Sequence, residues 1–447
     1  MTNRRLVAFL LTLSATLACV STTPTLTQKL TTCADLDAAW ATSDWPEVLC
    51  ILEQLQANDT ACGPEPLDVK QYAAHFSYAV VLEATGEIDA AIEQYQAALA
   101  LDGRRQEALN ALSRLDALPT PTSPACNPSE LPPYTPTSSS PFVSVKESRI
   151  ALGEKDFFIQ GVNYYPRHAP WERFLTEGSL DEMVEELDLI AGAGLNTLRI
   201  FLWYEPLFTC TPEEAMPVTE IFTKLDAIIA LASERSLHLI VTLNDLPDLH
   251  FRPLYADWAH YDSQTAFIIS RYQDEPTILA WDLRNEADLD YGARDGGGQF
   301  ERESVLAWLA HTAEIVRAND ANHLITAGWW GDAVETTAAV DILSFHHWTD
   351  AVELESRIDA LREQSSKPIL IEEVGYPSWG EDGEAFQAEA LTKVISTADQ
   401  SQVAGWLIWI AFDFTPTNGQ PDSPEYHFGL WRTDLTPKPT LNALKAK

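Results

Sequence analysis

The pattern of apolar and polar positions changes character twice along the chain. From 31 to 118, small and apolar residues recur at helical spacing, and Thr85-Gly86 interrupts the pattern, which includes Ala91, Tyr95 and Ala98. Residues 119–141 are rich in Pro, Ser and Thr and cannot bury a core, so they are typical of an extended linker. From 142 to 447, short apolar runs alternate with amphipathic stretches. The pattern therefore predicts a small all-α domain, a linker and a larger α/β domain.

The larger domain contains eight apolar runs of strand length: Phe157–Tyr165, Thr197–Tyr204, Leu237–Asp245, Ile278–Leu283, Leu324–Trp330, Ile342–Trp348, Pro368–Val374 and Gly405–Phe412. The stretches between them predict helices, among them Leu180–Ala193, Phe222–Ser233, Ser304–Ala318, Leu354–Glu363 and Ala385–Ala398. Eight strand-then-helix units in roughly 300 residues fit a (β/α)8 TIM barrel. A doubly wound open sheet is the alternative. It would need a Gly-rich phosphate loop after an early strand, and Gly161-Val162-Asn163 is not one.

Length and charge narrow the classes of function. A chain of 447 residues is long for one core, which agrees with more than one folded unit. Its formal net charge is -37, from 66 acidic and 29 basic residues. Such a surface repels phosphate backbones, so nucleic acid is not expected as a partner, whereas a neutral oligo- or polysaccharide is compatible.

The amino terminus predicts export from the cell. Residues 1–18 combine a basic start with an apolar run too short to span a membrane, as in a signal peptide. The stretch Thr16-Leu17-Ala18-Cys19 resembles a bacterial lipoprotein processing site, which implies lipidation of Cys19 and a tether over 19–30. Cleavage and plain secretion are the alternative. We expect an extracellular or cell-surface protein whose only membrane contact is this anchor. Export allows disulfides, with no connectivity fixed, among Cys33, Cys50, Cys62, Cys126 and Cys210.

The segment Tyr78–Gly103 carries small and aromatic residues at the spacing of a known helical repeat: Ala79, Gly86-Glu87, Ala91, Tyr95 and Ala98. It resembles one tetratricopeptide repeat. Such repeats need neighbours to bury their faces. The resemblance implies either a structural spacer or a surface for a protein partner.

Polar and aromatic residues gather where the predicted strands end: Asn163, Tyr164 and Tyr165; Arg199 and Trp203; Asn244 and Asp245; Asn285 and Glu286; Trp329 and Trp330; His346, His347 and Trp348; Glu372 and Glu373; Trp409 and Asp413. The carboxyl ends of barrel strands are where parallel α/β enzymes keep their sites. Two of these ends carry carboxylates. A pair of carboxylates on two strand ends is the residue set that hydrolyses glycosidic bonds.

Several strand-end motifs together resemble one enzyme family: Gly161-Val162-Asn163, Asn196-Thr197-Leu198-Arg199, Asn285-Glu286, His346-His347-Trp348, Glu373-Val374-Gly375 and Trp409. By these motifs, residues 142–447 resemble a clan A glycoside hydrolase, closest to family 5, the cellulase and mannanase family. The resemblance implies a retaining hydrolase of β-linked neutral glycans, either β-glucan or β-mannan. It implies no cofactor and no metal.

The resemblance also assigns roles. It implies that Glu286 is the acid/base and Glu373 the nucleophile, with their carboxyl groups about 5–5.5 Å apart. The implied substrate-binding residues are Arg199, Asn285, His346, Trp348, Trp409, Asn163, Tyr164 and Asn244. Arg199 is expected to keep Glu373 ionised while Glu286 holds its proton.

Glu372 is the rival nucleophile. Successive strand residues point to opposite sides, so only one of Glu372 and Glu373 should enter the site, and the Glu-x-Gly spacing favours Glu373. Glu372 would then form an ion pair behind the barrel.

Two departures from the family leave the preferred sugar open. Trp348 stands where the family has Tyr, and Asn244-Asp245 stands where the family has His after the third strand. Two other functions remain as alternatives. The barrel could be a non-catalytic carbohydrate-binding surface protein, or the helical front end could make the chain chiefly an interaction protein.

Overall fold

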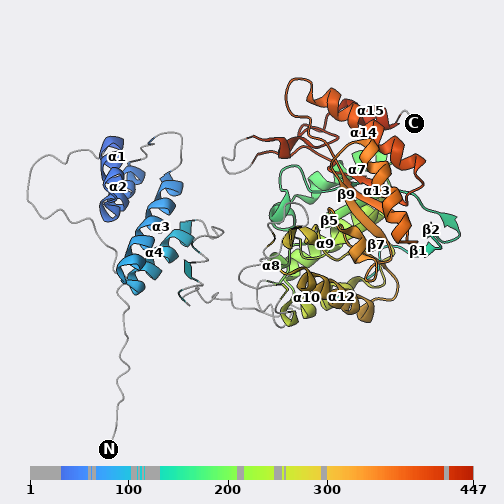
Figure 1. Ribbon diagram of the computed structural model, residues 1–447, viewed down its shortest axis with the longest axis horizontal. Helices are drawn as coiled ribbons and strands as arrows, with labels where there is room; N and C mark the ends of the chain where they lie inside the picture. Colours follow the sequence, from blue (N-terminus) through green and yellow to red (C-terminus); the bar gives the residue numbers. More distant parts are fainter. Residues whose placement is uncertain are drawn as a thin grey trace, which may run out of the picture. The chain divides into compact units, whose positions relative to one another are not determined.

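In a computed structural model, the residues described are 32–58, 62, 67–101, 108, 111–112, 115, 131–208, 216–245, 254–255, 258–292, 298, 300–416 and 422–445. The predicted signal peptide, the tether and Cys19 lie outside them. The chain divides into two compact units, residues 1–121 and 122–447, and each is described by itself (Figure 1). Within the described residues, no helix is both long and apolar enough to cross a membrane.

The first unit is helical, as the sequence predicts. It contains α1 (Cys33–Ala41), α2 (Trp45–Ala57), α3 (Leu67–Thr85) and α4 (Ile88–Leu101). Gly86, at a φ of +84°, adopts the left-handed conformation that separates α3 from α4. Ala79, Ala91 and Ala98 are fully buried in the hydrophobic cluster that α3 and α4 share, and a disulfide joins Cys33 to Cys62. The likeness to a tetratricopeptide repeat remains a prediction.

The second unit is built on an eight-stranded parallel sheet, in the order β8-β7-β6-β5-β4-β11-β10-β9. The strands are β4 (Ile159–Asn163), β5 (Thr197–Phe201), β6 (His238–Thr242), β7 (Ile278–Asp282), β8 (Leu324–Thr326), β9 (Leu343–His347), β10 (Ile369–Val374) and β11 (Gly405–Ile408). Backbone hydrogen bonds from Asp341 and Ile342 to Ile325, and a bridge between Trp329 and Phe345, join β8 to β9. The sheet therefore forms a nearly closed barrel, and each of the eight predicted strands is present.

Helices surround the strands (Figure 1). The five helices expected from sequence are α7 (Leu180–Gly192), α9 (Thr219–Glu234), α12 (Arg302–Asn319), α13 (Ala351–Gln364) and α14 (Gly383–Gln400), and α10 (Ala259–Tyr272) joins them. The chain between β8 and β9 departs from the expected unit. Its described helix there is η3 (Ala333–Thr336), a single 3-10 turn.

A small antiparallel sheet lies at the amino-terminal end of the barrel. It consists of β1 (Val143–Lys146), β2 (Arg149–Leu152) and β3 (Lys155–Asp156). Val143 and Ile150 pack against barrel residues including Ile159, Ile240 and Leu279. Nothing in the pattern of the sequence predicted this sheet.

The later part of the predicted linker lies against the barrel. The hydroxyl of Tyr134 donates a hydrogen bond of 2.8 Å to Oε2 of Glu275, and the backbone N–H of Thr137 donates one of 2.6 Å to the same atom. Residues 131–140 are therefore bound to the barrel surface by specific contacts and do not form a free linker.

Candidate active site

Arg199, on β5, lies at the centre of the site and is fully buried. Its guanidinium donates hydrogen bonds to Oδ2 of Asp282 at 2.6 and 3.0 Å, to Oδ1 of Asn285 at 2.8 Å and to Oδ1 of Asn163 at 3.1 Å. It also donates to Oε1 of Glu373. One planar cation therefore orients four side chains from three strands and their ends, which is what the fork geometry of arginine allows.

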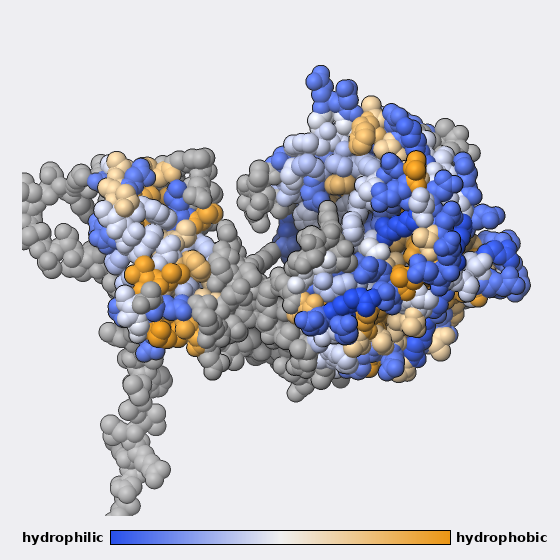
Figure 2. Space-filling view, in the orientation of Figure 1, coloured by the Kyte–Doolittle hydropathy of each residue, from blue (hydrophilic) through white to orange (hydrophobic). Residues whose placement is uncertain are grey.

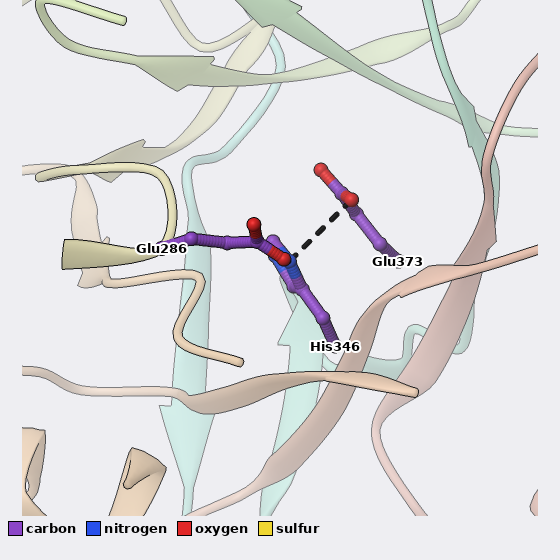
Figure 3. A group of neighbouring side chains, drawn as sticks. All are labelled: Glu286, His346 and Glu373. Atoms are coloured by element: carbon purple, nitrogen blue, oxygen red, sulfur yellow. Dashed lines mark hydrogen bonds and ion pairs between the residues drawn. The ribbon is translucent and has the colours of Figure 1, made fainter. Parts of the chain in front are cut away.

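Glu286 and Glu373 face each other across this centre (Figure 3). Glu286 follows β7 in a left-handed conformation, at a φ of +47°, and its N–H bonds the carbonyl of Gly328 at 2.7 Å. Nδ1 of His346, from β9, lies 2.7 Å from Oε1 of Glu286 and 3.4 Å from Oε2 of Glu373. The facing oxygens of the two carboxylates and this nitrogen lie within 4.8 Å of one another. The fold thus brings together two carboxylates that are 87 residues apart in the sequence.

The same three side chains could in principle hold a cation, since each offers one ligand atom within that 4.8 Å. Two observations favour proton sharing instead. Nδ1 of His346 is already at hydrogen-bond distance from Glu286, and the guanidinium of Arg199, which binds Glu373, places a positive charge beside the group.

The two carboxylates open onto a cleft of about 490 Å³. Its lining residues are Tyr165, Trp171, Phe201, Asp245, Asn285, Glu286, Trp348, Glu373, Gly375, Tyr376, Pro377, Trp409, Glu425 and Phe428. Ring faces and carboxylates predominate among them, and none of these lining residues is Lys, Arg or His. Such a cleft suits a neutral molecule with apolar faces and many hydroxyl groups.

Most of the residues singled out from sequence lie together. Glu286, Glu373, Asn285, Trp348 and Trp409 line the cleft. Arg199 and His346 lie directly behind it and bind residues that do, and Asn163 accepts a hydrogen bond from Arg199.

Tyr164 and Asn244 do not line the cleft, contrary to the expectation from sequence. The Tyr164 hydroxyl donates a hydrogen bond of 2.6 Å to Glu186 on α7, because residue 164 follows an inward-facing Asn163 and so points outward. Asn244 faces a different, very small cavity, behind the barrel wall.

The residues that follow Tyr164 and Asn244 in the sequence line the cleft instead. Tyr165 and Asp245 line it, and the Tyr165 hydroxyl donates a hydrogen bond of 2.8 Å to Asp245. The alternation of side chains along the first strand could have identified Tyr165 from the sequence. Trp171 comes from the 3-10 turn η1 (Trp171–Arg173) and Tyr376 from the loop after β10, and no signal in the sequence marked either. Phe428 begins the tail Phe428-Gly429-Leu430, which resembles the family as well.

Glu372 also departs from expectation, because β10 has a bulge. Ile371 pairs with Phe345 and Glu373 with His346, so Glu372 is one extra residue on its strand. The bulge breaks the alternation on which the prediction relied. Glu372 is fully buried inside the barrel, with Oε1 3.7 Å from Nε of Arg199, and it does not lie behind the barrel.

The order of the two carboxyl pKa values is the reverse of the expected one, because the pKa of Glu373 is raised and that of Glu286 is lowered. Burial raises the pKa of Glu373 to about 7, although His346 and Arg199 oppose the rise. Burial also acts on Glu286, but the hydrogen bond and charge of His346 outweigh it and hold the pKa of that carboxyl below its usual value. The reason is that Arg199 is shared among Asp282, Glu372 and Glu373, so it does not keep Glu373 ionised by itself.

Fold and site together define a (β/α)8-barrel protein with two facing carboxylates on the ends of its fourth and seventh barrel strands, the architecture of clan A glycoside hydrolases. Within this class, a match to a family model identifies the family. The family model described as Cellulase (glycosyl hydrolase family 5) matches residues 168–412, more than half of the chain. The chain belongs to that family. The match leaves out the helical unit.

Curated relatives of similar sequence are mannan endo-1,4-beta-mannosidases. Mannan endo-1,4-beta-mannosidase F of Aspergillus fumigatus is 24% identical over 224 residues, which cover 43% of this chain and 48% of the relative. Mannan endo-1,4-beta-mannosidase 1 of Solanum lycopersicum is 24% identical over 247 residues, which cover 46% of this chain and 57% of the relative. The chain thus spans about half the length of these relatives.

Solved structures share the barrel. A GH5_18 protein of Streptomyces cattleya in complex with Manβ1-4GlcNAc has a TM-score of 0.57 and 20% identity, covering 64% of this chain and 79% of that one. An exo-beta-1,4-mannosidase of an Opitutaceae bacterium has a TM-score of 0.55 and 17% identity, covering 65% of this chain and 59% of that one. These likenesses show the fold.

Proposed function

We propose that the barrel is a retaining glycoside hydrolase that cleaves β-linked mannosides. The observation that carries the proposal is the pair Glu286 and Glu373, whose facing oxygens lie within 4.8 Å on one cleft. Carboxyl groups at about 5–5.5 Å perform double displacement, whereas direct attack by water needs roughly 6.5–9.5 Å. The short separation therefore supports retention over inversion.

In the proposed mechanism Glu286 gives its proton to the glycosidic oxygen while the carboxylate of Glu373 attacks the anomeric carbon. Glu286 then takes a proton from water, and that water releases the sugar from Glu373. Asn285 and Trp409 line the same cleft and are placed to hold the sugar at the cleaved bond. Arg199 balances the negative charge that returns to Glu373 as the covalent bond breaks.

Mannosides are preferred over other β-glycosides on two grounds. The curated relatives named above are mannan endo-1,4-beta-mannosidases, and one structural neighbour holds Manβ1-4GlcNAc. Uronides are disfavoured, because none of the residues that line the cleft is cationic and a buried carboxylate needs a positive partner.

The first test distinguishes the role of nucleophile from the role of acid/base. Glu373→Ala and Glu286→Ala should each lower kcat on mannooligosaccharides by at least about 10³-fold. Added azide should restore turnover of an activated aryl mannoside, giving an α-mannosyl azide from Glu373→Ala and a β-mannosyl azide from Glu286→Ala. The roles are reversed if the two azide products are exchanged, and the proposal fails if both variants keep substantial turnover.

A matched screen tests the substrate. Wild-type protein is assayed on mannooligosaccharides, Manβ1-4GlcNAc, cellooligosaccharides and aryl β-glucuronides. Cleavage of the manno-configured substrates at the highest kcat/KM is the expected result. Binding without hydrolysis of any of them would favour the carbohydrate-binding alternative.

We also propose that the chain is exported and anchored through lipidated Cys19. The Cys33–Cys62 disulfide supports an oxidising compartment. Labelling with radioactive palmitate, compared between wild type and Cys19→Ser, tests the anchor. Label that persists in the variant would rule it out.

A further inference from the structure

Trp379 is an exposed aromatic side chain in a protein whose other tryptophans are buried or half-buried. Its side chain is 46% exposed, and it is the one Trp among the exposed large apolar residues of the described part of the chain. The face of the barrel seen in Figure 2 is mostly hydrophilic, with apolar residues in small separate patches. A single exposed ring needs no explanation by itself, so its position and its support decide what it does.

Trp379 lies at the rim of the active-site cleft. The chain leaves β10 through Tyr376 and Pro377, which both line the cleft, and Trp379 follows two residues after Pro377, at most about 7 Å along the backbone. Its ring packs on His427, with centroids 4.9 Å apart and an interplanar angle of 47°. Phe428, the next residue after His427, lines the cleft as well. Two segments of the cleft wall therefore meet at this ring.

Hydrogen bonds hold the backbone beside Trp379 in place. The N–H and the hydroxyl of Ser378 each donate a bond of 2.9 Å to the carbonyl of His427. The buried ammonium group of Lys438 donates to Oγ of Ser378 at 2.7 Å and to the same carbonyl at 3.1 Å. Because the ring is attached to a fixed backbone, a ligand that binds it loses little free energy to ordering the loop.

The surroundings of the ring suit a neutral sugar. The flat, apolar face of an indole matches the C–H face of a pyranose, and His427 covers only part of the Trp379 ring. Glu381 and Asp382 follow closely in the chain and are exposed, so an anionic polymer is disfavoured here. The cleft itself, of about 490 Å³, has the volume of a small-molecule site. A longer glycan must therefore leave it across the rim.

We propose that Trp379 forms a further sugar-binding subsite, on which a pyranose beyond the two units at the cleaved bond stacks. The inference rests on the function proposed above and deepens it, because it makes longer oligosaccharides better substrates than a disaccharide. The occupant is a unit of the same glycan chain, since the wall runs without a break from Tyr376 and Phe428 to this ring.

The experiment compares two chain lengths. Mannobiose fills only the positions on either side of the cleaved bond, whereas mannohexaose extends beyond them. Wild type should therefore have the higher kcat/KM on mannohexaose. In Trp379→Ala, kcat/KM should fall about tenfold for mannohexaose and change by less than about twofold for mannobiose, as expected for the loss of one aromatic contact.

Three further variants show whether the ring itself is needed. Trp379→Tyr keeps an aromatic face, so its ratio of the two kcat/KM values should lie closer to wild type than to Trp379→Ala. Trp379→Leu keeps apolar surface without a ring and should behave as Trp379→Ala does. Trp258→Ala is the matched control, because Trp258 also packs on a histidine, His311, with centroids 4.5 Å apart, but does not line the cleft. Its ratio should stay at the wild-type value.

Three results would overturn the subsite: equal falls for both substrates in Trp379→Ala, an unchanged ratio in that variant, or a Tyr variant no better than the Leu variant. Calorimetry separates this failure from failure of the proposed function. In the background of Glu373→Ala, Trp379→Ala should weaken binding of mannohexaose about tenfold. If wild type cleaves neither substrate, the proposed function has failed, and this loss of affinity still supports the subsite. If mannohexaose does not bind either, both proposals are overturned.

Discussion

Nδ1 of His346 lies 2.7 Å from Oε1 of Glu286, closer than it lies to Glu373. This contact favours the charged form of Glu286 and holds the pKa of that carboxyl below its usual value. Cleavage by the proposed mechanism requires Glu286 in its protonated form. The predictions that follow test the contacts on which that account depends.

Replacement of His346 should move the whole pH profile upward. In His346→Phe, burial acts on Glu286 and Glu373 without the opposing hydrogen bond and charge, so both pKa values rise. The two limbs of kcat/KM report the two apparent pKa values of this coupled pair of carboxyl groups. Both limbs should shift to higher pH by about one unit. A shift of either limb to lower pH would contradict the assignment.

Removal of Asp282 should destabilise the barrel strongly. Asp282 is fully buried and accepts two hydrogen bonds from Arg199, one from the Thr242 hydroxyl at 2.6 Å and one from Gly328 N–H at 3.1 Å. Asp282→Ala leaves a buried guanidinium short of a partner, at a cost of about 3–5 kcal/mol in the free energy of unfolding. Chemical denaturation of wild type and Asp282→Ala measures this loss of unfolding free energy.

The matched control for this change is Asp156→Ala. Asp156 pairs with Arg149 at 2.6 Å, but its side chain is 66% exposed. Exposed ion pairs contribute at most about 1 kcal/mol. Equal losses in the two variants would show that burial of the Arg199 cluster contributes nothing.

Barrel stability should fall as the pH rises from about 4.5 to about 7. Burial raises the pKa of Glu372 and of Glu373 from 4.5 to about 7, so the folded state favours the protonated forms. The stabilisation is complete below the unfolded-state pKa and is lost as the pH passes through the folded-state value. Unfolding free energies measured across this range should decline, and Glu372→Gln should flatten the decline. An increase with pH would contradict the prediction.

Trp409 should matter for binding at the cleaved bond. Its ring lines the cleft and lies edge-on to Phe201, with centroids 5.9 Å apart. Trp409→Ala should lower kcat/KM on mannooligosaccharides at least about tenfold, the equivalent of one lost aromatic contact of about 1.4 kcal/mol. Unchanged kinetics together with reduced stability would assign the ring to the core.

The Cys33–Cys62 disulfide should stabilise the helical unit alone. It closes a segment with a sequence separation of 29, for which chain entropy gives about 3.5 kcal/mol. Cys33→Ser with Cys62→Ser should lower the melting temperature of the helical unit and leave kcat of the barrel unchanged. A loss of barrel activity would show that the two units depend on each other.

The strands and the facing positions of Glu286 and Glu373 could be predicted because their signals are local. Runs such as Ile278–Asp282 are apolar throughout, and Glu286 and Glu373 follow such runs in short motifs. Asp282 was not singled out, since it ends an apolar run and nothing in the sequence marks it as the main partner of Arg199.

Other features depend on register and on contacts between distant segments. Alternation would have chosen Tyr165 over Tyr164, whereas the bulge that turns Glu372 inward appears only when β10 is paired with β9. The reversed protonation order follows from how many carboxylates share Arg199. That number is set by three-dimensional packing and has no counterpart in a motif.

The small sheet β1–β3 limits how far the chain can be trimmed for laboratory work. Val143 and Ile150 shield Ile159, Ile240 and Leu279 from solvent, so a protein begun at residue 157 would present an apolar end that favours aggregation. A start at residue 131 also keeps the contacts of Tyr134 and Thr137 with Glu275. Expression of the barrel by itself should therefore begin no later than this residue.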